Sequence, residues 1–167
     1  MIGTVTVVIV NVASQIEPPS THLEFEVQNH SDAPIWLVDD GWLIWRQTGK
    51  EIELSYARGV MQPGTQVFGY FSPSVVKIDP GNRILHVVHL TWPQPLDRLW
   101  NAEPYATPTP GEYRVSVHVG YGVAPEPDLP SAGEGVESPI FRWQREASSE
   151  SVSMQVPPYS QAGSNSE

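Results

Sequence analysis

The clearest strand signal in the chain is the segment Thr109-Pro110-Gly111-Glu112-Tyr113-Arg114-Val115-Ser116-Val117-His118-Val119-Gly120-Tyr121-Gly122. Large apolar side chains occupy every second position from Tyr113 to Tyr121, and polar or small residues occupy the positions between them. Successive side chains of an extended chain point to opposite faces, so this alternation predicts a strand with one buried and one solvent-facing side. The Pro110-Gly111 pair before it is a turn signal.

Tyr113 follows this turn as the tyrosine of a tyrosine corner does in immunoglobulin-like sandwiches, where the hydroxyl ties the entering loop to the strand. The rest of the chain consists of short β-rich runs separated by turns, with 17 prolines and 13 glycines. We therefore predict an all-β fold, an immunoglobulin-like antiparallel β-sandwich. A chain of 167 residues is long enough for one such domain with a tail or large loops.

Other strands are expected on both sides of this segment. Residues 21–28 alternate most cleanly, because Leu23, Phe25 and Val27 share one face while the residues between them are polar. The β-rich character of the remaining runs predicts strands at residues 4–12, 35–38, 66–71, 83–92 and 139–145.

Residues 42–56 have the pattern of a β-hairpin. With Thr48 and Gly49 as the two central turn residues, opposite charges meet on one face and apolar groups on the other. The pairs expected are Gln47 with Lys50, Arg46 with Glu51, Trp45 with Ile52 and Leu43 with Leu54.

The segment from Glu146 to Glu167 is rich in Ser, Gln, Gly and Asn, and its apolar residues are isolated. Such a segment buries too little surface to offset its ordering entropy. We expect a β-sandwich domain at residues 1–145 and a disordered polar, acidic tail at residues 146–167.

The charge balance of the chain constrains its partners. With 19 acidic and 9 basic residues the formal charge is -10, which disfavours nucleic acid and anionic membranes as partners. The absence of cysteine excludes disulfides and thiolate chemistry and favours a reducing, cytoplasmic location. The apolar N-terminal run lacks a basic region before it, so it is interpreted as a first strand and not as a secretion signal.

The histidines are the side chains best suited to metal binding or catalysis. His86 and His89 are three positions apart, which places them on opposite faces of a strand and prevents both from binding one ion without a bulge. His118 lies on the solvent side of its strand. The chain has no nucleophile elbow, phosphate loop or zinc-protease motif, and Asp39-Asp40 lacks calcium-loop spacing. We expect no cofactor, no metal site and no enzymatic activity.

Six tryptophans are many for one small domain, and exposed ones would serve as anchors for a protein or a sugar. We predict a binding surface at the end of the sandwich formed by the loops 39–42 and 93–110. Its candidate residues are Asp39, Asp40, Trp42, Trp92, Asp97, Arg98, Trp100, Asn101 and Tyr105. In the competing interpretation, Trp100 folds back and plugs the open end of the core.

A series of motifs in the middle of the chain resembles a known family. Residues 23–31 include a strand that ends in Asn29-His30-Ser31. Pro34-Ile35, then Pro80-Gly81, then Pro110-Gly111-Glu112-Tyr113 follow in that order. This order resembles bacterial immunoglobulin-like domains of the intracellular proteinase-inhibitor type. The resemblance spans about residues 21–122 and implies the sandwich fold, but it provides no inhibitory loop.

Taken together, these features predict a non-catalytic protein-binding module with an inhibitory or regulatory role. A carbohydrate-binding module that uses exposed tryptophans is the alternative, and an enzyme has the least support. The sequence predicts neither the partner nor the oligomeric state.

Overall fold

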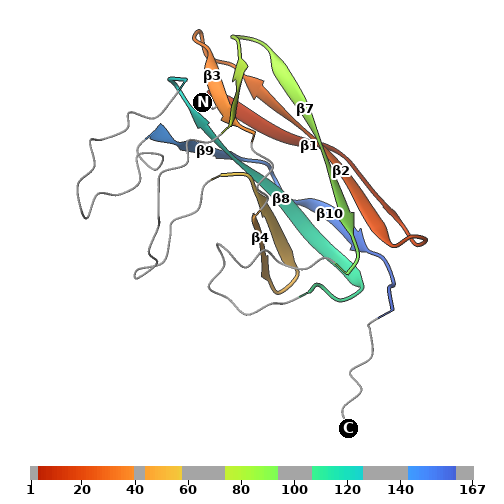
Figure 1. Cartoon of the computed structure of the whole chain (residues 1–167). Coiled ribbons are helices and arrows are strands. Elements are labelled where there is room, and N and C mark those ends of the chain that lie inside the picture. Colours follow the sequence, from red (N-terminus) through yellow and green to blue (C-terminus); the bar gives the residue numbers. More distant parts are fainter. Residues whose placement is uncertain (1–3, 40–43, 58–73, 94–106, 126–142, 161–167) are drawn as a thin grey trace.

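The computed structural model describes residues 4–39, 44–57, 74–93, 107–125 and 143–160 (Figure 1). These residues form an all-β structure, as predicted. Its strands are β1 (Val5–Gln15), β2 (Ser20–Asn29), β3 (Ile35–Val38), β4 (Ile44–Thr48), β5 (Glu51–Ser55), β6 (Val75–Ile78), β7 (Arg83–Thr91), β8 (Gly111–Gly122), β9 (Arg145–Ser148) and β10 (Val152–Val156).

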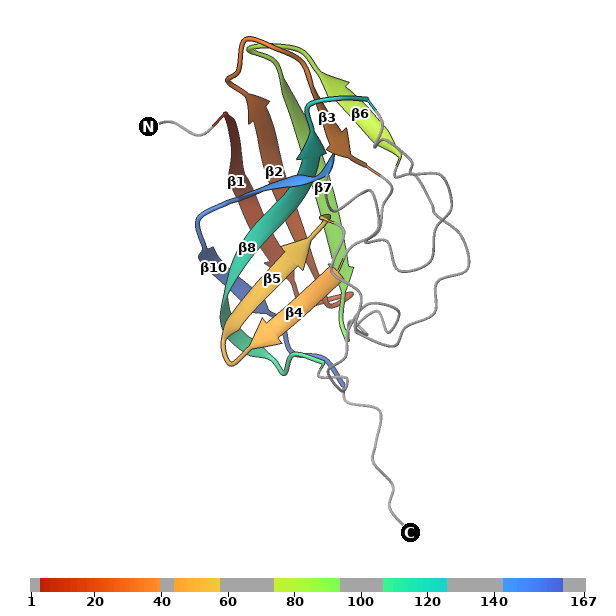
Figure 2. The same cartoon turned by 90° about the vertical axis from the view of Figure 1, so that its left-hand side faces the viewer.

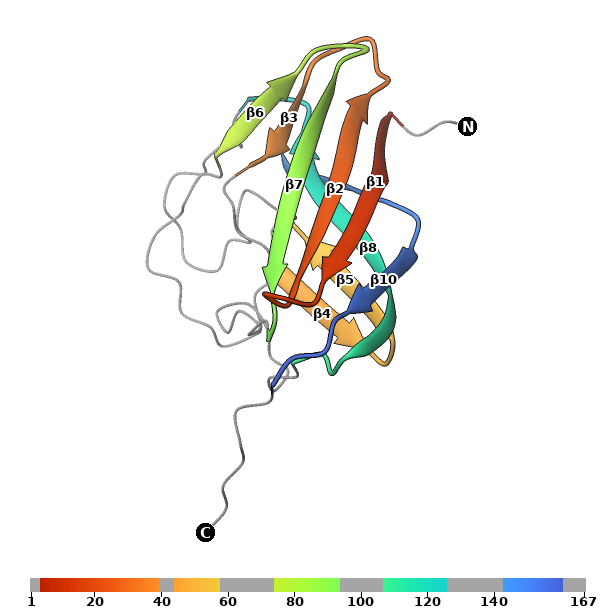
Figure 3. The same cartoon turned by 90° about the vertical axis from the view of Figure 1, so that its right-hand side faces the viewer.

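Three strands form an antiparallel sheet in the order β1-β2-β7, which Figure 3 shows face on. Their residues are mostly β-branched or alternate between apolar and polar, which suits a half-buried sheet. The ladder between β1 and β2 shifts by one residue between Ile9 and Asn11, so Val10 is an extra residue in β1.

The remaining seven strands form a second, mixed sheet around β8 (Figures 1 and 2). Strand β8 pairs in parallel with β5 and antiparallel with β3, β9 and β10. The outer members are β4, which pairs with β5, and β6, which pairs with β3. The segment with the clearest strand signal in the sequence is therefore the central strand of this sheet.

Side chains from both sheets meet in one hydrophobic cluster. Leu23, Phe25 and Val27 of β2 are buried in it, as are Val115 and Val117 of β8. Full burial of such a side chain is worth about 1.5–3 kcal/mol relative to its exposure. The period-two alternation in both strands thus explains which of their faces is buried.

Two buried residues with polar groups, Tyr113 and Asn29, hold the backbone next to strand ends through hydrogen bonds. The hydroxyl of Tyr113 donates a hydrogen bond of 2.9 Å to the carbonyl oxygen of Thr109, and the ring is buried. Asn29, also buried, accepts hydrogen bonds from the backbone and side chain of Ser31 and donates to the carbonyl oxygens of Ala33 and Ile78. The bond from Tyr113 is the one expected of a tyrosine corner.

The hairpin of β4 and β5 exists, but its predicted register is wrong. Its strands pair Trp45 with Leu54, Arg46 with Glu53, Gln47 with Ile52 and Thr48 with Glu51. The central turn residues are therefore Gly49 and Lys50 instead of Thr48 and Gly49. Gly49 has a φ of 59°, a conformation that favours glycine at the first central position of a tight hairpin turn.

The prediction that residues 146–167 form a disordered tail is wrong for most of this segment. Strands β9 and β10 both pair with β8, and Met154 and Val156 of β10 are buried in the core. The domain therefore extends at least to Val156 and does not end at residue 145. Residues 161–167 lie outside the described residues.

The predicted strand at 35–38 has the predicted bounds, and those at 4–12, 21–28 and 83–92 differ by three residues or fewer at each end. The predicted strand at 66–71 lies outside the described residues. Of the predicted strand at 139–145, only Trp143, Gln144 and Arg145 are described, and β9 begins at Arg145.

Candidate functional site

Two of the nine predicted binding residues are described, and they lie in different environments. Trp92 is only 3% exposed, and its indole nitrogen donates a hydrogen bond of 2.9 Å to the hydroxyl of Thr21. Its prediction as a binding anchor is wrong, because a ring buried in the core cannot contact a partner. Asp39 is exposed at the end of β3. The other predicted residues, which lie outside the described ones, are Asp40, Trp42, Asp97, Arg98, Trp100, Asn101 and Tyr105.

Asp39 belongs to a small cluster with His86 and Tyr56. Its carboxylate is 3.9 Å from Nδ1 of His86, and the imidazole stacks on Phe25 with ring centroids 5.1 Å apart. Burial lowers the pKa of His86, although the charge of Asp39 opposes this effect. Burial, with a smaller contribution from Asp39, raises the pKa of Tyr56 to about 12. Burial in this cluster therefore disfavours the charged forms of both the imidazole and the phenol.

Nε2 of His86 is buried without a hydrogen-bond partner among the described residues. His89 lies on the opposite, exposed face of β7, as predicted from the spacing. His118, on the solvent side of β8, is 3.7 Å from the carboxylate of Glu53. Within the part of the chain that the structure describes, no three His, Cys, Asp or Glu side chains are grouped so that they could hold a metal ion.

His89 pairs across the strands with His22 on the exposed side of the three-stranded sheet. The two rings meet edge to face with centroids 4.7 Å apart. Nε2 of His22 is 2.9 Å from the carboxylate of Glu24, and this hydrogen bond lowers the pKa of Glu24. These histidines therefore form part of a polar row on the sheet surface.

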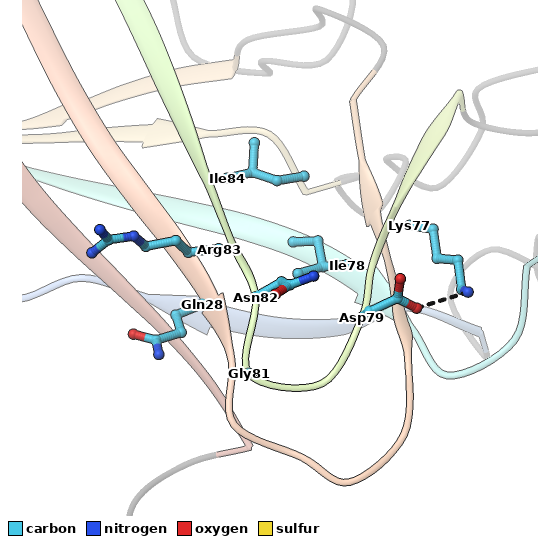
Figure 4. A pocket seen from close by; sticks show the side chains of 8 residues that line it. All are labelled: Gln28, Lys77, Ile78, Asp79, Gly81, Asn82, Arg83 and Ile84. Carbon is cyan, nitrogen blue, oxygen red and sulfur yellow. Dashed lines mark ion pairs between the residues drawn. The ribbon is translucent and has the colours of Figure 1, made fainter.

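A hollow of about 480 Å³ lies beside the turn between β6 and β7 (Figure 4). Lys77 and Arg83 supply its positive charges, and each is paired with a carboxylate: Lys77 with Asp79 at 2.7 Å, and Arg83 with Glu26 at 3.3 Å. Because both cations already have carboxylate partners, the hollow has no excess positive charge with which to attract an anion.

The exposed side of the sheet β1-β2-β7, here called the outer face, combines polar and apolar residues. Its middle strand carries Glu24 and Glu26, while the flanking strands expose large apolar side chains. The exposed fractions are 52% for Val8, 49% for Val10, 53% for Leu85 and 49% for Val87. The register places Val8 and Leu85 on either side of Glu26, so apolar groups border an acidic centre.

Strand β7 pairs with β2 through one of its two edges. The N–H of Trp92 donates to the carbonyl of Pro19, and the carbonyl of Asn82 accepts from the N–H of Asn29. Asn82 and Trp92 flank β7 on either side, and both are even-numbered. In an antiparallel ladder every second residue bonds to a given neighbour, so the even-numbered residues of β7 bond to β2.

The odd-numbered residues of β7 consequently direct their N–H and C=O groups away from β2. These residues, here called the β7 edge, are Arg83, Leu85, Val87, His89 and Thr91. Among the described residues, no strand pairs with this edge. The side chains of the same five residues lie exposed on the outer face. Figure 3 shows β7 at the margin of its sheet.

Leu85 and Val87 are not among the binding residues predicted from the sequence. A signal for them exists, because the run from Arg83 to Thr91 places apolar residues on both faces of the strand. A half-buried strand would normally carry polar residues on its outer face. The apolar residues at these exposed positions make this part of β7 a candidate contact surface.

No helix in the described part of the chain is long and apolar enough to cross a membrane. Comparisons with protein-family models, curated proteins and solved structures found no match to this chain.

Proposed function

We propose that this protein is a non-catalytic protein-binding module that binds its partner through the β7 edge. The observation that carries the proposal concerns the same five residues of β7. Their backbone groups pair with no other described strand, and their side chains are exposed, two of them large and apolar. A partner segment in extended conformation would add to the sheet as a fourth strand.

Edge strands that are not meant to pair are usually protected by lysine, proline, a bulge or a covering element. Strand β7 is nine residues long and contains neither lysine nor proline, and its only charged residue is Arg83 at its start. In such a complex, backbone hydrogen bonds supply affinity, and the neighbours of Leu85 and Val87 supply specificity.

For the fold we propose an immunoglobulin-like sandwich, as the sequence motifs suggested. The hydrogen bond from Tyr113 to Thr109 supports it. So does the pairing of β2 with both β1 and β7, and of β8 with both β3 and the C-terminal strands. Side chains of both sheets share one core. The resemblance to proteinase-inhibitor domains favours an inhibitory or regulatory role within the same class of function.

The carbohydrate-binding alternative requires exposed tryptophan rings. Trp92 is buried, Trp36 is half-buried, and the half-buried Trp143 donates a hydrogen bond of 2.7 Å to the carbonyl of Ala124. These described rings do not form an exposed stacking platform, so they do not favour sugar binding. The side chains of Trp42, Trp45 and Trp100 lie outside the described residues.

The proposal is tested by photo-cross-linking in the organism that makes the protein. A photoreactive phenylalanine derivative is placed at Val87 in one variant and at Val8 in a matched control. Both positions lie on the outer face and are about half exposed, but Val8 is two strands away from the β7 edge. We expect a defined cross-linked protein from position 87 and none from position 8.

The captured protein is then purified, and its affinity is measured for the unmodified chain, for Val87→Lys and for Val8→Lys. We expect Val87→Lys to weaken binding at least about tenfold, because a cation replaces an apolar contact at the centre of the edge. Val8→Lys should bind within about twofold. Equal cross-linking from both positions, or equal affinity for both variants, would overturn the proposal.

A further inference from the structure

We infer that the β7 edge can bind a second copy of this chain. In this dimer, β7 of one chain pairs antiparallel with β7 of the other about a twofold axis at Val87, which joins the two three-stranded sheets into one. The inference rests on the proposed use of the β7 edge and names a partner for it.

The geometry of β7 satisfies the condition for such a twofold axis. Val87 is the midpoint of the strand Arg83–Thr91, and it is also one of the residues whose backbone groups point away from β2. Two copies can therefore form a hydrogen-bonded pair of Val87 with Val87 and use the full length of both strands. The ladder would contain about ten backbone hydrogen bonds, two for each pair of facing edge residues.

Side chains across this ladder are compatible. Val87 faces Val87, Leu85 faces His89 of the second copy, and Arg83 faces Thr91 of the second copy. None of these pairs brings like charges together, and the two apolar residues of each chain form a continuous stripe over the twofold axis. Apolar cross-strand pairs of this kind stabilise a sheet.

The net charge of -10 on each chain is the main opposing effect. Among the described residues of the outer face, the acidic residue closest to the axis is Glu24, which is paired with Val87 in the β2–β7 ladder. The two Glu24 residues of a dimer are separated by three strand spacings, or about 14 Å. This exceeds the screening length of about 8 Å at physiological ionic strength, so their repulsion is largely screened.

Pairing through strand edges alone buries less surface than the roughly 1,200–2,000 Å² of a stable interface. We therefore expect a weak dimer whose population depends on protein concentration. Because the dimer occupies the β7 edge, a different protein that binds the same edge must compete with it.

Disulfide trapping tests the position of the axis. The chain has no cysteine, so Val87→Cys introduces a single thiol. Facing residues in a hydrogen-bonded antiparallel pair have Cα atoms about 5.5 Å apart, which is within the range that a disulfide spans. Under mild oxidation we expect disulfide-linked dimers of Val87→Cys at least about tenfold faster than those of Val8→Cys, which has a similarly exposed thiol. Equal rates would overturn the inference.

Sedimentation of the unmodified chain tests the dimer without a new thiol. We expect a concentration-dependent shift towards twice the mass, lost in Val87→Lys and kept in Val8→Lys. Val87→Lys places two cations opposite each other at the axis. Circular dichroism of each variant checks that the fold is retained.

The two proposals can fail separately. If the chain is monomeric at all concentrations while another protein cross-links at position 87, the inference is overturned and the proposed function stands. If the dimer forms as described and position 87 captures only a second copy, the inference stands and binding of a different protein is excluded under those conditions.

Discussion

The hydroxyl of Tyr159, near the C-terminal end of the described chain, donates a hydrogen bond of 2.6 Å to the carbonyl oxygen of Pro108. The next carbonyl, that of Thr109, accepts the hydrogen bond from Tyr113. Two tyrosines that are far apart in the sequence therefore hold the segment that enters β8. Tyr159 comes from the region expected to be disordered, so this contact links the corner of the fold to its C-terminal strands.

We predict that Tyr113→Phe lowers the free energy of unfolding by about 1–3 kcal/mol. The substitution leaves the ring packing intact but removes the donor to the Thr109 carbonyl. Chemical denaturation at constant pH measures the change. Tyr159→Phe should cost less, because Tyr159 is only half-buried. A change near zero for Tyr113→Phe would contradict a structural role for this hydrogen bond.

We predict that Met154→Ala lowers the free energy of unfolding by about 2–5 kcal/mol, because Met154 is only 1% exposed and its truncation leaves a cavity. Gln155→Ala is the matched control on the same strand, since its side chain is exposed, and it should change stability by less than about 0.5 kcal/mol. Equal effects of the two substitutions would show that β10 does not pack on the core.

The error over residues 146–167 has an identifiable cause. Averaged over the whole segment, the composition is polar, and that average favours disorder. The short run Val152-Ser153-Met154-Gln155-Val156 nevertheless alternates between apolar and polar residues. Val152, Met154 and Val156 point inward. These three apolar residues are enough to add the run to the sheet, because β8 supplies the strand with which it pairs. The alternation over these five residues predicts the strand correctly, whereas the average composition of residues 146–167 does not.

We predict that Gly49→Ala destabilises the protein by about 1–2 kcal/mol. Gly49 has a φ of 59°, and no atom lies within 4 Å of the position a Cβ would take. The cost is therefore conformational and not steric. Gly49→Asn should cost less, because asparagine tolerates this conformation better than alanine does. If both variants were as stable as the unmodified chain, the turn assignment would be wrong.

Sequence alternation could not have fixed the register of this hairpin. The predicted register pairs Trp45 with Ile52, and the observed one pairs Trp45 with Leu54. The two differ by two residues, so every side chain stays on the same face in both. The positive φ of Gly49 distinguishes them, because the observed turn uses glycine at its first central position.

The candidate site was less predictable than the fold. The spacing of His86 and His89 correctly predicted that they lie on opposite faces of the strand, because side chains on a strand alternate. Trp92 was misjudged as a binding residue, although the same alternation places it on the face of Val88 and Leu90, which is buried. The position of β7 at the edge of its sheet follows from the order of the described strands, and this order depends on contacts between residues distant in the sequence. A local pattern does not contain that information.

Our last prediction concerns pH. Burial lowers the pKa of His86 below its ordinary value of 6.5, so the folded state binds fewer protons at this site than the unfolded state does. The protonation of His86 therefore does not reduce the free energy of unfolding at neutral pH. It reduces that free energy as the pH falls below about 6.5 towards the lowered pKa of the folded state. A tenfold lower proton affinity in the folded state corresponds to about 1.4 kcal/mol.

Titration of the His86 ring by NMR measures this effect directly, and it should give a pKa below 6.5. Asp39→Asn should lower that pKa further, because the carboxylate 3.9 Å away stabilises the charged imidazole. In His86→Phe, which retains an aromatic ring against Phe25, the free energy of unfolding should fall less between pH 7 and about 5 than in the unmodified chain. A His86 pKa at or above 6.5, or an unchanged pKa in Asp39→Asn, would show that burial and this ion pair do not control the protonation of the ring.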